Sequence, residues 1–180
     1  MIKVGIIGVS GYAGAELLRL LLNHDEVKVV SIGARSYQGQ PISDLYPSFY
    51  QVCDMICESD EDVLQKAELI FASLPHGLSE KYAKYCDENN KKFIDLGADF
   101  RLDSEQDYQE WYKLDYHEKA LHDKQVYGLS EVNREKIKTA TLIGNPGCYP
   151  TSITLGLYPL LKEKLNLNKH IIIDSKSGTT

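Results

Sequence analysis

The sequence has few of the features that are typical of disulfide-rich, membrane-spanning or nucleic-acid-binding proteins. Its 180 residues include only four cysteines, and no apolar run approaches the roughly 18 residues that a membrane-spanning helix needs. No stretch is rich in Lys and Arg, and the net charge is −6, so a nucleic-acid face or a polybasic membrane anchor is not expected. The N-terminus turns into a glycine-rich loop before any signal-like apolar region develops. We therefore expect a cytoplasmic protein that binds neither membranes nor nucleic acid.

The few cysteines fit neither a disulfide nor a metal pattern. Cys53 and Cys57 on one strand would lie roughly 13 Å apart, which is too far for a disulfide. Their C-x-x-x-C spacing lacks a second pair of Cys or His, so no metal site is predicted. We expect Cys53, Cys57 and Cys86 to be buried structural thiols. Cys148 stands in a different context, described below.

Short apolar runs alternate with helical patterns along the chain. We expect buried strands at 2–8, 27–33, 68–74, 92–97, 140–145 and 170–175, and helices at 14–24, 59–67, 79–90 and 149–165. The second helix begins with a Ser-x-x-Asp capping signal, and the charged, aromatic segment 104–124 is predicted to form surface helix. Such alternation predicts an α/β fold, a Rossmann-like doubly wound parallel sheet with right-handed crossovers.

The first strand runs into the glycine-rich stretch GVSGYAGAEL. Gly8, Gly11 and Gly14 precede the first helix, where glycines permit a tight turn and let the backbone approach a pyrophosphate. The spacing is G-x-x-G-x-x-G, which differs from the strict dinucleotide pattern. Its place between the first strand and the first helix favours a dinucleotide site.

Two further loops refine this hypothesis. At the end of the second strand, where an NAD enzyme carries an acid, this sequence has Arg35 and Ser36. An arginine forms a charge-assisted fork with a ribose 2′-phosphate, so the sequence favours NADP over NAD. After the third of these strands, Pro75 and Gly77 mark a sharp turn around His76. His76 is either a cofactor contact or a polar loop residue.

Cys148 lies in GNPGCYPTS, between the end of a predicted strand and the start of a predicted helix. Pro150 suits the first turn of that helix, and a helix N-terminus stabilises a thiolate. The flanking Pro and Gly residues would fix a turn that projects the thiol toward the edge that holds the glycine loop. A thiol beside an NADPH site predicts attack on an activated acyl group, followed by reduction of the thioester to an aldehyde.

Six motifs together resemble one enzyme family. The stretches GVSGYAGAELLRLL, SLPHG, DLGADFRL, VYGLSEVNR, NPGCYPTS and DSKSGTT are similar to those of N-acetyl-gamma-glutamyl-phosphate reductases of arginine biosynthesis, and they span residues 3–180. The resemblance implies NADPH-dependent reduction of an acyl phosphate to a semialdehyde with release of phosphate. Cys148 would be its nucleophile.

The resemblance also implies roles for other positions. The cofactor residues would be Gly8, Ser10, Gly11, Tyr12, Ala13, Gly14, Arg35, Ser36, Pro75, His76, Ser177 and Gly178. Arg101 and Asn145 would contact the anionic substrate, a small-molecule acyl phosphate.

Members of that family are about twice as long as this chain. The resemblance therefore implies an NADP-binding domain at 1–147, lacking its C-terminal segment, and the beginning of an α+β catalytic and dimerisation domain at 148–180. The family's acid-base histidine would lie downstream. We expect this chain alone to be inactive and the full-length protein to be a homo-oligomer.

Two other functions remain open from the sequence. Aspartate-semialdehyde dehydrogenase shares the chemistry, although its cysteine context differs from NPGCYPT. A non-catalytic NADP-binding module would instead use Cys148 as a redox sensor, and it would show reversible oxidation without acyl transfer.

Overall fold

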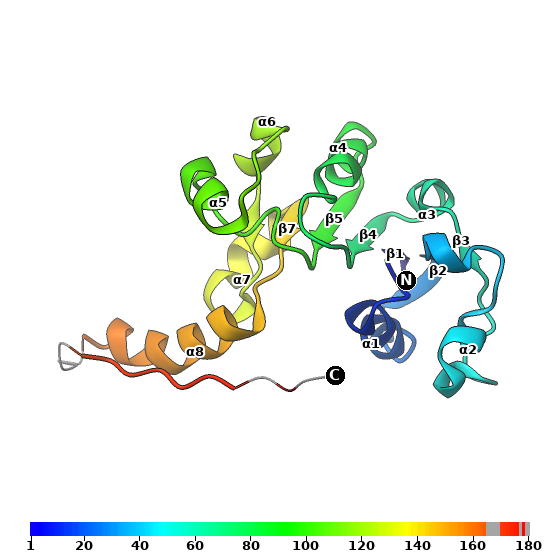
Figure 1. The fold of residues 1–180 in the computed structure, drawn as a ribbon, viewed down its shortest axis with the longest axis horizontal. Coiled ribbons are helices and arrows are strands. Elements are labelled where there is room, and N and C mark those ends of the chain that lie inside the picture. Colours follow the sequence, from blue (N-terminus) through cyan, green and yellow to red (C-terminus); the bar gives the residue numbers. More distant parts are fainter. Residues whose placement is uncertain (165–169, 177, 179–180) are drawn as a thin grey trace.

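The computed structural model describes residues 1–164, 170–176 and 178. Its centre is a seven-stranded parallel sheet in the order β3-β2-β1-β4-β5-β7-β6 (Figure 1). The strands are β1 Ile2–Ile7, β2 Val27–Gly33, β3 Cys57–Glu58, β4 Leu69–Ala72, β5 Lys92–Asp95, β6 Val126–Tyr127 and β7 Leu142–Gly144. The sheet confirms the predicted doubly wound α/β class.

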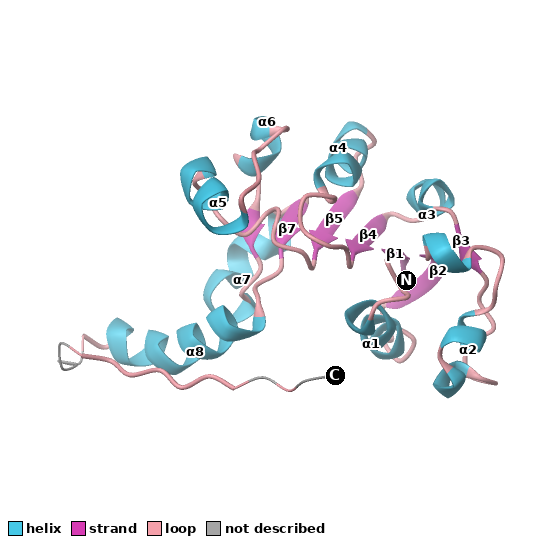
Figure 2. Ribbon diagram, in the orientation of Figure 1, coloured by secondary structure: helices cyan, strands magenta, loops and turns pink. Residues whose placement is uncertain are grey.

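Helices cover both faces of the sheet (Figure 2). They are α1 Tyr12–Leu21, α2 Ile42–Leu45, α3 Asp60–Lys66, α4 Glu80–Glu88, α5 Glu105–Tyr112, α6 Lys119–His122, α7 Ser130–Thr139 and α8 Cys148–Lys162, with 3-10 turns η1 Arg35–Tyr37 and η2 Pro47–Phe49. One core lies between the sheet and α3, α4 and α6. A second core lies between the sheet and α1 and α2.

Local sequence explains the principal elements. The side chains of β1 alternate between the two cores, so Val4 and Ile6 join the second core while Ile7 joins the first. Ala15 and Leu18 lie on one face of α1 and pack in the same core as Ile6. At α3 the Ser59 hydroxyl accepts the backbone N–H of Asp62 at 3.0 Å, which confirms the predicted cap.

The sheet order places a topological switch between β1 and β4. From β1 the chain winds outward to β2 and β3, and it then returns to β4 on the other side. Ligands of open α/β sheets bind beyond the strand carboxyl ends at such a switch. The loops after β1 and β4 therefore mark the expected binding edge.

The prediction of a strand at 170–175 is wrong, because this segment forms no β-strand in the structure. It runs back beside α8, where the hydroxyls of Ser152 and Ser175 lie 3.5 Å apart (Figure 1). Its isoleucines are exposed, and Ile172 retains 94% of its accessible surface. An apolar run becomes a strand only where backbone partners exist, and the described sheet offers none here.

Other elements differ from their predicted bounds or were not foreseen. The segment 104–124 forms two helices, α5 and α6, because Lys113 adopts a left-handed conformation that ends the first of them. The two-residue strands β3 and β6 and the polar helix α7 had no clear pattern. None of the described helices combines the length and the apolar character needed to cross a membrane.

Candidate active site

The glycine loop after β1 is held against the sheet by close backbone contacts. Gly8 has φ +85°, and a Cβ there would lie 2.2 Å from the carbonyl oxygen of Ser73 at the end of β4. A Cβ on Gly14 would lie 2.3 Å from the Gly8 carbonyl oxygen. The N–H groups of Gly8 and Val9 both donate to the Gly33 carbonyl, at 2.9 and 3.0 Å. Gly8 and Gly14 are therefore required by the fold itself.

Gly11 differs from the other two glycines. A Cβ there would meet only the Gly8 carbonyl oxygen, at 3.7 Å, which is an ordinary contact, and its φ of −81° suits any residue. Gly11 is the N-cap of α1, where no side chain caps the helix and no acid lies in the first turn. The first amides of α1 are thus available to an anion. A closely approaching phosphate would explain a glycine that the protein interior does not need.

Arg35 begins η1 directly beyond β2. Its Nε donates to the Asp60 Oδ2 at 2.9 Å, and its Nη2 donates to the Tyr82 hydroxyl at 2.5 Å. That hydroxyl in turn donates to the same Asp60 oxygen at 2.5 Å. Burial raises the pKa of Tyr82 to about 12, and the hydrogen bond to Asp60 acts in the same direction. Tyr82 therefore stays protonated at neutral pH.

The glycine loop, Arg35 and Pro75 line one hollow of about 200 Å³ at the switch point. Its lining consists of Gly8, Ser10, Ala34, Arg35, Ser36, Asp60, Leu74, Pro75 and Leu78. His76 does not line it. The His76 ring meets Tyr112 of α5 edge-on, with 5.1 Å between centroids. Of the residues predicted to bind the cofactor, the hollow thus brings together Gly8, Ser10, Arg35, Ser36 and Pro75.

A buried carboxylate fixes the loop that carries Pro75 and His76. Asp99 accepts the N–H of Gly77 at 2.7 Å and the N–H of Ser79 at 2.8 Å, and it also accepts the Tyr108 hydroxyl at 2.9 Å. Asp99 is only 1% exposed. One carboxylate therefore joins the loop after β4 to α5.

A second buried acid, Asp95, ends β5 next to this loop. Its Oδ1 accepts the Ser79 hydroxyl at 2.6 Å and the Gly97 N–H at 3.0 Å, whereas its Oδ2 has no hydrogen-bond partner among the described residues. Burial raises the pKa of Asp95 to about 6, and the negative charge of Asp99 adds to this effect. The hydrogen bond from Ser79 opposes it.

Arg101 lies against the turn that precedes Cys148. It donates from Nε to the Asn145 carbonyl and from Nη2 to the Leu96 carbonyl, each at 2.8 Å. A Cβ on Gly147 would lie 3.2 Å from its Nη1. Both partners are neutral carbonyls, and Arg101 forms no ion pair within the described residues. Its charge is therefore available to an anionic ligand.

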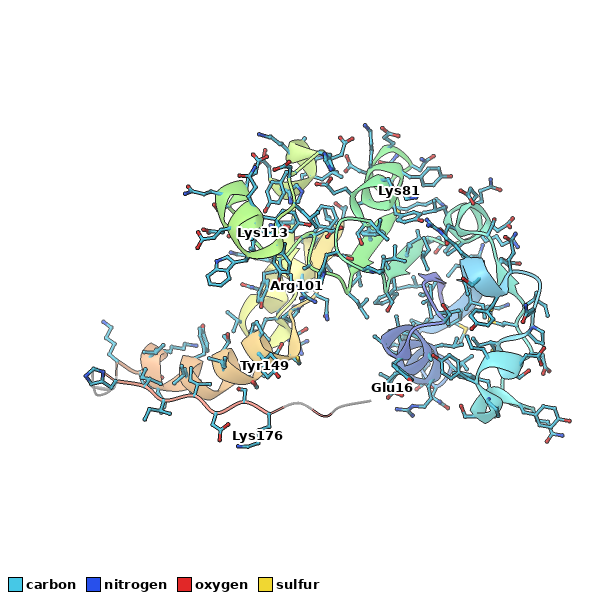
Figure 3. The ribbon with its side chains drawn as sticks, viewed as in Figure 1. Glu16, Lys81, Arg101, Lys113, Tyr149 and Lys176 are labelled. Carbon is cyan, nitrogen blue, oxygen red and sulfur yellow. The ribbon has the colours of Figure 1, made fainter. Side chains whose placement is uncertain are left out.

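The approach of Arg101 to this turn depends on Gly144. A Cβ on Gly144 would lie 1.7 Å from the Phe100 carbonyl oxygen, so only glycine lets the two backbones meet. The Asn145 N–H donates to the Asp95 carbonyl at 2.8 Å, which holds the chain as β7 ends. Figure 3 shows Arg101 beside the start of α8, where Tyr149 is labelled.

Cys148 is the first residue of α8, and its thiol is free and exposed. The other three cysteines are free and buried, as predicted. Gly147 is the N-cap, and its carbonyl accepts both the N–H and the hydroxyl of Thr151, at 3.0 and 2.8 Å. The thiol thus projects from a helix start on the sheet edge that carries Arg101.

Two predicted cofactor residues fall in the last four positions of the sequence. Gly178 is exposed, with no atom within 4 Å of an added Cβ, and Ser177 lies outside the described residues. Sequence reasoning in turn missed Asp60, Tyr82 and Asp99. Asp99 is the first residue of the DFRL stretch, which could have flagged it, but no pattern singles out Asp60 among the three acids that open α3.

A parallel sheet with a glycine loop at its switch point defines the dinucleotide-binding class of α/β domain. Residues 3–140 match the family model described as semialdehyde dehydrogenase, NAD binding domain. Residues 148–180 match the model described as semialdehyde dehydrogenase, dimerisation domain. The chain belongs to the semialdehyde dehydrogenase family.

Curated relatives with high sequence identity share one name. The chain is 54% identical over 180 residues to a protein of Clostridium beijerinckii named N-acetyl-gamma-glutamyl-phosphate reductase. A protein of the same name from Brachyspira hyodysenteriae is 46% identical over 187 residues. Each match covers all of this chain but only 52% and 53% of those proteins. The chain thus spans about half the length of the curated relatives it matches.

Solved structures support the fold. Aspartate semialdehyde dehydrogenase with NADP from Candida albicans superposes with a TM-score of 0.60 at 17% identity, covering 91% of this chain and 47% of that one. Aspartate semialdehyde dehydrogenase II complexed with ASA from Vibrio cholerae gives 0.62 at 18% identity, covering 90% and 47%. At such identity the likeness concerns the fold alone.

Proposed function

We propose that this chain carries the cofactor site and the nucleophile of an NADPH-dependent enzyme that reduces N-acetyl-gamma-glutamyl phosphate to N-acetylglutamate semialdehyde in arginine biosynthesis. The observation that supports the proposal is an exposed thiol, Cys148, that directly follows the turn contacted by Arg101, which forms no ion pair within the described residues. The names of relatives at 46–54% identity support the choice of substrate.

The hollow at the switch point fits a nicotinamide dinucleotide. The pyrophosphate would lie on the N–H groups of residues 12–14 at the start of α1, where Gly11 leaves room. Arg35 and Ser36 would bind a 2′-phosphate, which makes NADP the proposed cofactor. When bound, NADPH supplies a hydride.

The chain's own residues would act in order. The Cys148 thiolate attacks the acyl carbonyl, a carbon–sulfur bond forms, and the carbon–oxygen bond to phosphate breaks with release of phosphate. Once the thioester carbonyl is reduced, the hemithioacetal anion on Cys148 would collapse to the aldehyde and return the thiolate. Arg101 would hold an anionic group of the substrate, with Asn145 beside it, and amides at the start of α8 would stabilise the developing oxyanion.

We further propose that the whole protein is longer and assembles as a homo-oligomer in the cytoplasm, with the described domain ending near Gly147. A groove of about 450 Å³ on the sheet face beside α7 is lined by Phe93, Ile94, Ile137 and Ile143. The exposed Ile171, Ile172 and Ile173 form a second apolar surface. Later segments of the protein and a second copy would cover these surfaces, and the acid-base group would come from those segments.

The reverse reaction tests the substrate. Full-length protein is given NADP and inorganic phosphate with N-acetylglutamate semialdehyde or with aspartate semialdehyde, and NADPH is followed by absorbance. We expect NADPH only with the N-acetylated substrate, at a rate that Cys148→Ser lowers at least a thousandfold while NADP binding persists. A preference for aspartate semialdehyde would contradict the proposed substrate. No turnover with either, together with reversible oxidation of Cys148, would favour a redox-sensing module.

A further inference from the structure

The buried pair formed by Asp60 and Tyr82 suggests how cofactor selectivity is built. These residues come from different helices, α3 and α4, and both meet Arg35 of η1. The Asp60 side chain is 7% exposed and Tyr82 is 4% exposed, whereas the Arg35 side chain is 61% exposed. Two interior groups therefore hold one edge of a guanidinium whose remainder is open to solvent.

The hydrogen bonds leave part of Arg35 free. A guanidinium has five N–H donors, and here one from Nε and one from Nη2 are used within the triangle. The remaining N–H groups have no partner among the described residues. Arg35, Ser36 and Asp60 line the hollow at the switch point, whereas Tyr82 does not. Tyr82 can therefore affect a ligand there only through Arg35 and Asp60.

An arginine side chain free to rotate would discriminate less well between cofactors with and without a 2′-phosphate. An arginine side chain loses rotamer freedom when it is fixed, and a pre-formed hydrogen-bonded frame meets part of that cost before the ligand arrives. The Oδ2 of Asp60 already takes two donors, from Arg35 and from Tyr82, so this oxygen is not free to accept from ribose hydroxyls. Asp60, the acid at this edge of the sheet, thus binds Arg35.

We propose that Asp60 and Tyr82 are positioning residues that orient Arg35 toward the cofactor's 2′-phosphate and thereby set the preference for NADPH over NADH. The inference rests on the proposed NADP site. It goes beyond that proposal because it assigns selectivity to two interior residues that need not touch the cofactor.

The two positions are not equally suited to a test. Removal of the Asp60 carboxylate would release Arg35 and also remove a negative charge near the bound phosphate, and the two effects oppose each other. Tyr82→Phe removes only a neutral hydroxyl. Tyr85→Phe makes the same chemical change one turn along α4 at a residue outside the hydrogen bonds of Arg35 and Asp60, and it is the control.

The test measures binding, so it does not depend on turnover. Calorimetry gives the dissociation constants of adenosine 2′,5′-bisphosphate and of AMP for full-length wild type, Tyr82→Phe, Tyr85→Phe and Arg35→Ala. We expect Tyr82→Phe to weaken the bisphosphate about threefold to tenfold, in line with one neutral hydrogen bond, and AMP less than twofold. Tyr85→Phe should change neither, and Arg35→Ala should weaken the bisphosphate about tenfold or more.

The possible failures are distinguishable. If Arg35→Ala weakens the bisphosphate selectively but Tyr82→Phe does not, or if Tyr82→Phe weakens both ligands equally, the positioning inference is overturned and the NADP site stands. If Arg35→Ala leaves the bisphosphate unaffected, the proposed 2′-phosphate site is wrong, and the inference fails with it.

Discussion

Gly11 and Gly14 stand three residues apart in one loop but are glycines for different reasons. A Cβ on Gly14 would press against the Gly8 carbonyl at 2.3 Å, whereas one on Gly11 would find space. We expect Gly14→Ala to lower the free energy of unfolding by about 1–3 kcal/mol, as overpacking does. Gly11→Ala should change it by less than about 1 kcal/mol yet weaken NADP binding roughly tenfold, because the methyl group occupies the phosphate's path.

Urea unfolding and NADP titration of the two variants check this prediction. Each variant is the control for the other, since both add one methyl group to the same loop. Tight NADP binding by Gly11→Ala would show that the glycine loop does not cradle the pyrophosphate.

The raised pKa of Asp95 predicts that the stability of the fold changes with pH. Its pKa is raised to about 6 by burial, compared with about 3.9 in an unfolded chain. A carboxyl whose pKa is higher in the folded state stabilises the protein below its unfolded pKa, and that stabilisation is lost as the pH rises through 6. The loss between pH 4 and pH 6 is on the order of 3 kcal/mol.

Asp95→Asn, which resembles the protonated acid, isolates this effect. Urea unfolding at several pH values should show that the wild type loses stability relative to the variant between pH 4 and pH 6. Parallel curves for the two proteins across that interval would contradict a raised pKa.

At the scale of elements, α5 is tied to the loop after β4 by Tyr108 and Asp99. The Tyr108 hydroxyl donates to a buried carboxylate at 2.9 Å, and hydrogen bonds to charged groups contribute about 1.5–3 kcal/mol. We expect Tyr108→Phe to lower the free energy of unfolding by about that amount and to speed hydrogen exchange at Gly77 and Ser79.

Tyr112→Phe, on the same helix, is the control, because its hydroxyl makes no hydrogen bond to another described residue. It should leave both the free energy of unfolding and the exchange rates nearly unchanged. Equal effects of the two variants would mean that α5 is held by packing alone and that Asp99 does not order the loop.

The elements that sequence predicted well are those that bury a periodic apolar face. β1, β2, α1 and α3 fall within a few residues of their predicted ranges because local pattern and capping agree with the packing. The strand predicted at 170–175 is absent because a strand needs a neighbouring strand to pair with, and apolar character alone does not provide one. Arg35 with Pro75 could be grouped because parallel strands end at one edge, whereas Arg101 was linked to Cys148 only by the family resemblance. The link from Arg35 to Asp60 and Tyr82 needed the fold, since η1, α3 and α4 converge only in three dimensions.

At the scale of the whole molecule, the chain spans about half the length of the curated relatives. We therefore expect the 180-residue chain, tested alone, to bind NADP weakly and to show no turnover, because on the proposed function later segments would cover its apolar surfaces and supply the acid-base group. Assays of the chain and the full-length protein side by side check this. Full activity of the chain alone would contradict it.

The central claim is that Cys148 forms the acyl-enzyme, and its most direct test is to trap that species. Full-length protein is mixed with N-acetylglutamate semialdehyde and NADP without phosphate, quenched in acid and digested for peptide mass spectrometry. Hydride loss to NADP would leave the acyl group on sulfur, so we predict about one NADPH per site and an N-acetylglutamyl thioester on the Cys148 peptide that inorganic phosphate discharges. NADPH formation without an adduct at Cys148, or an adduct on another residue, would contradict the account.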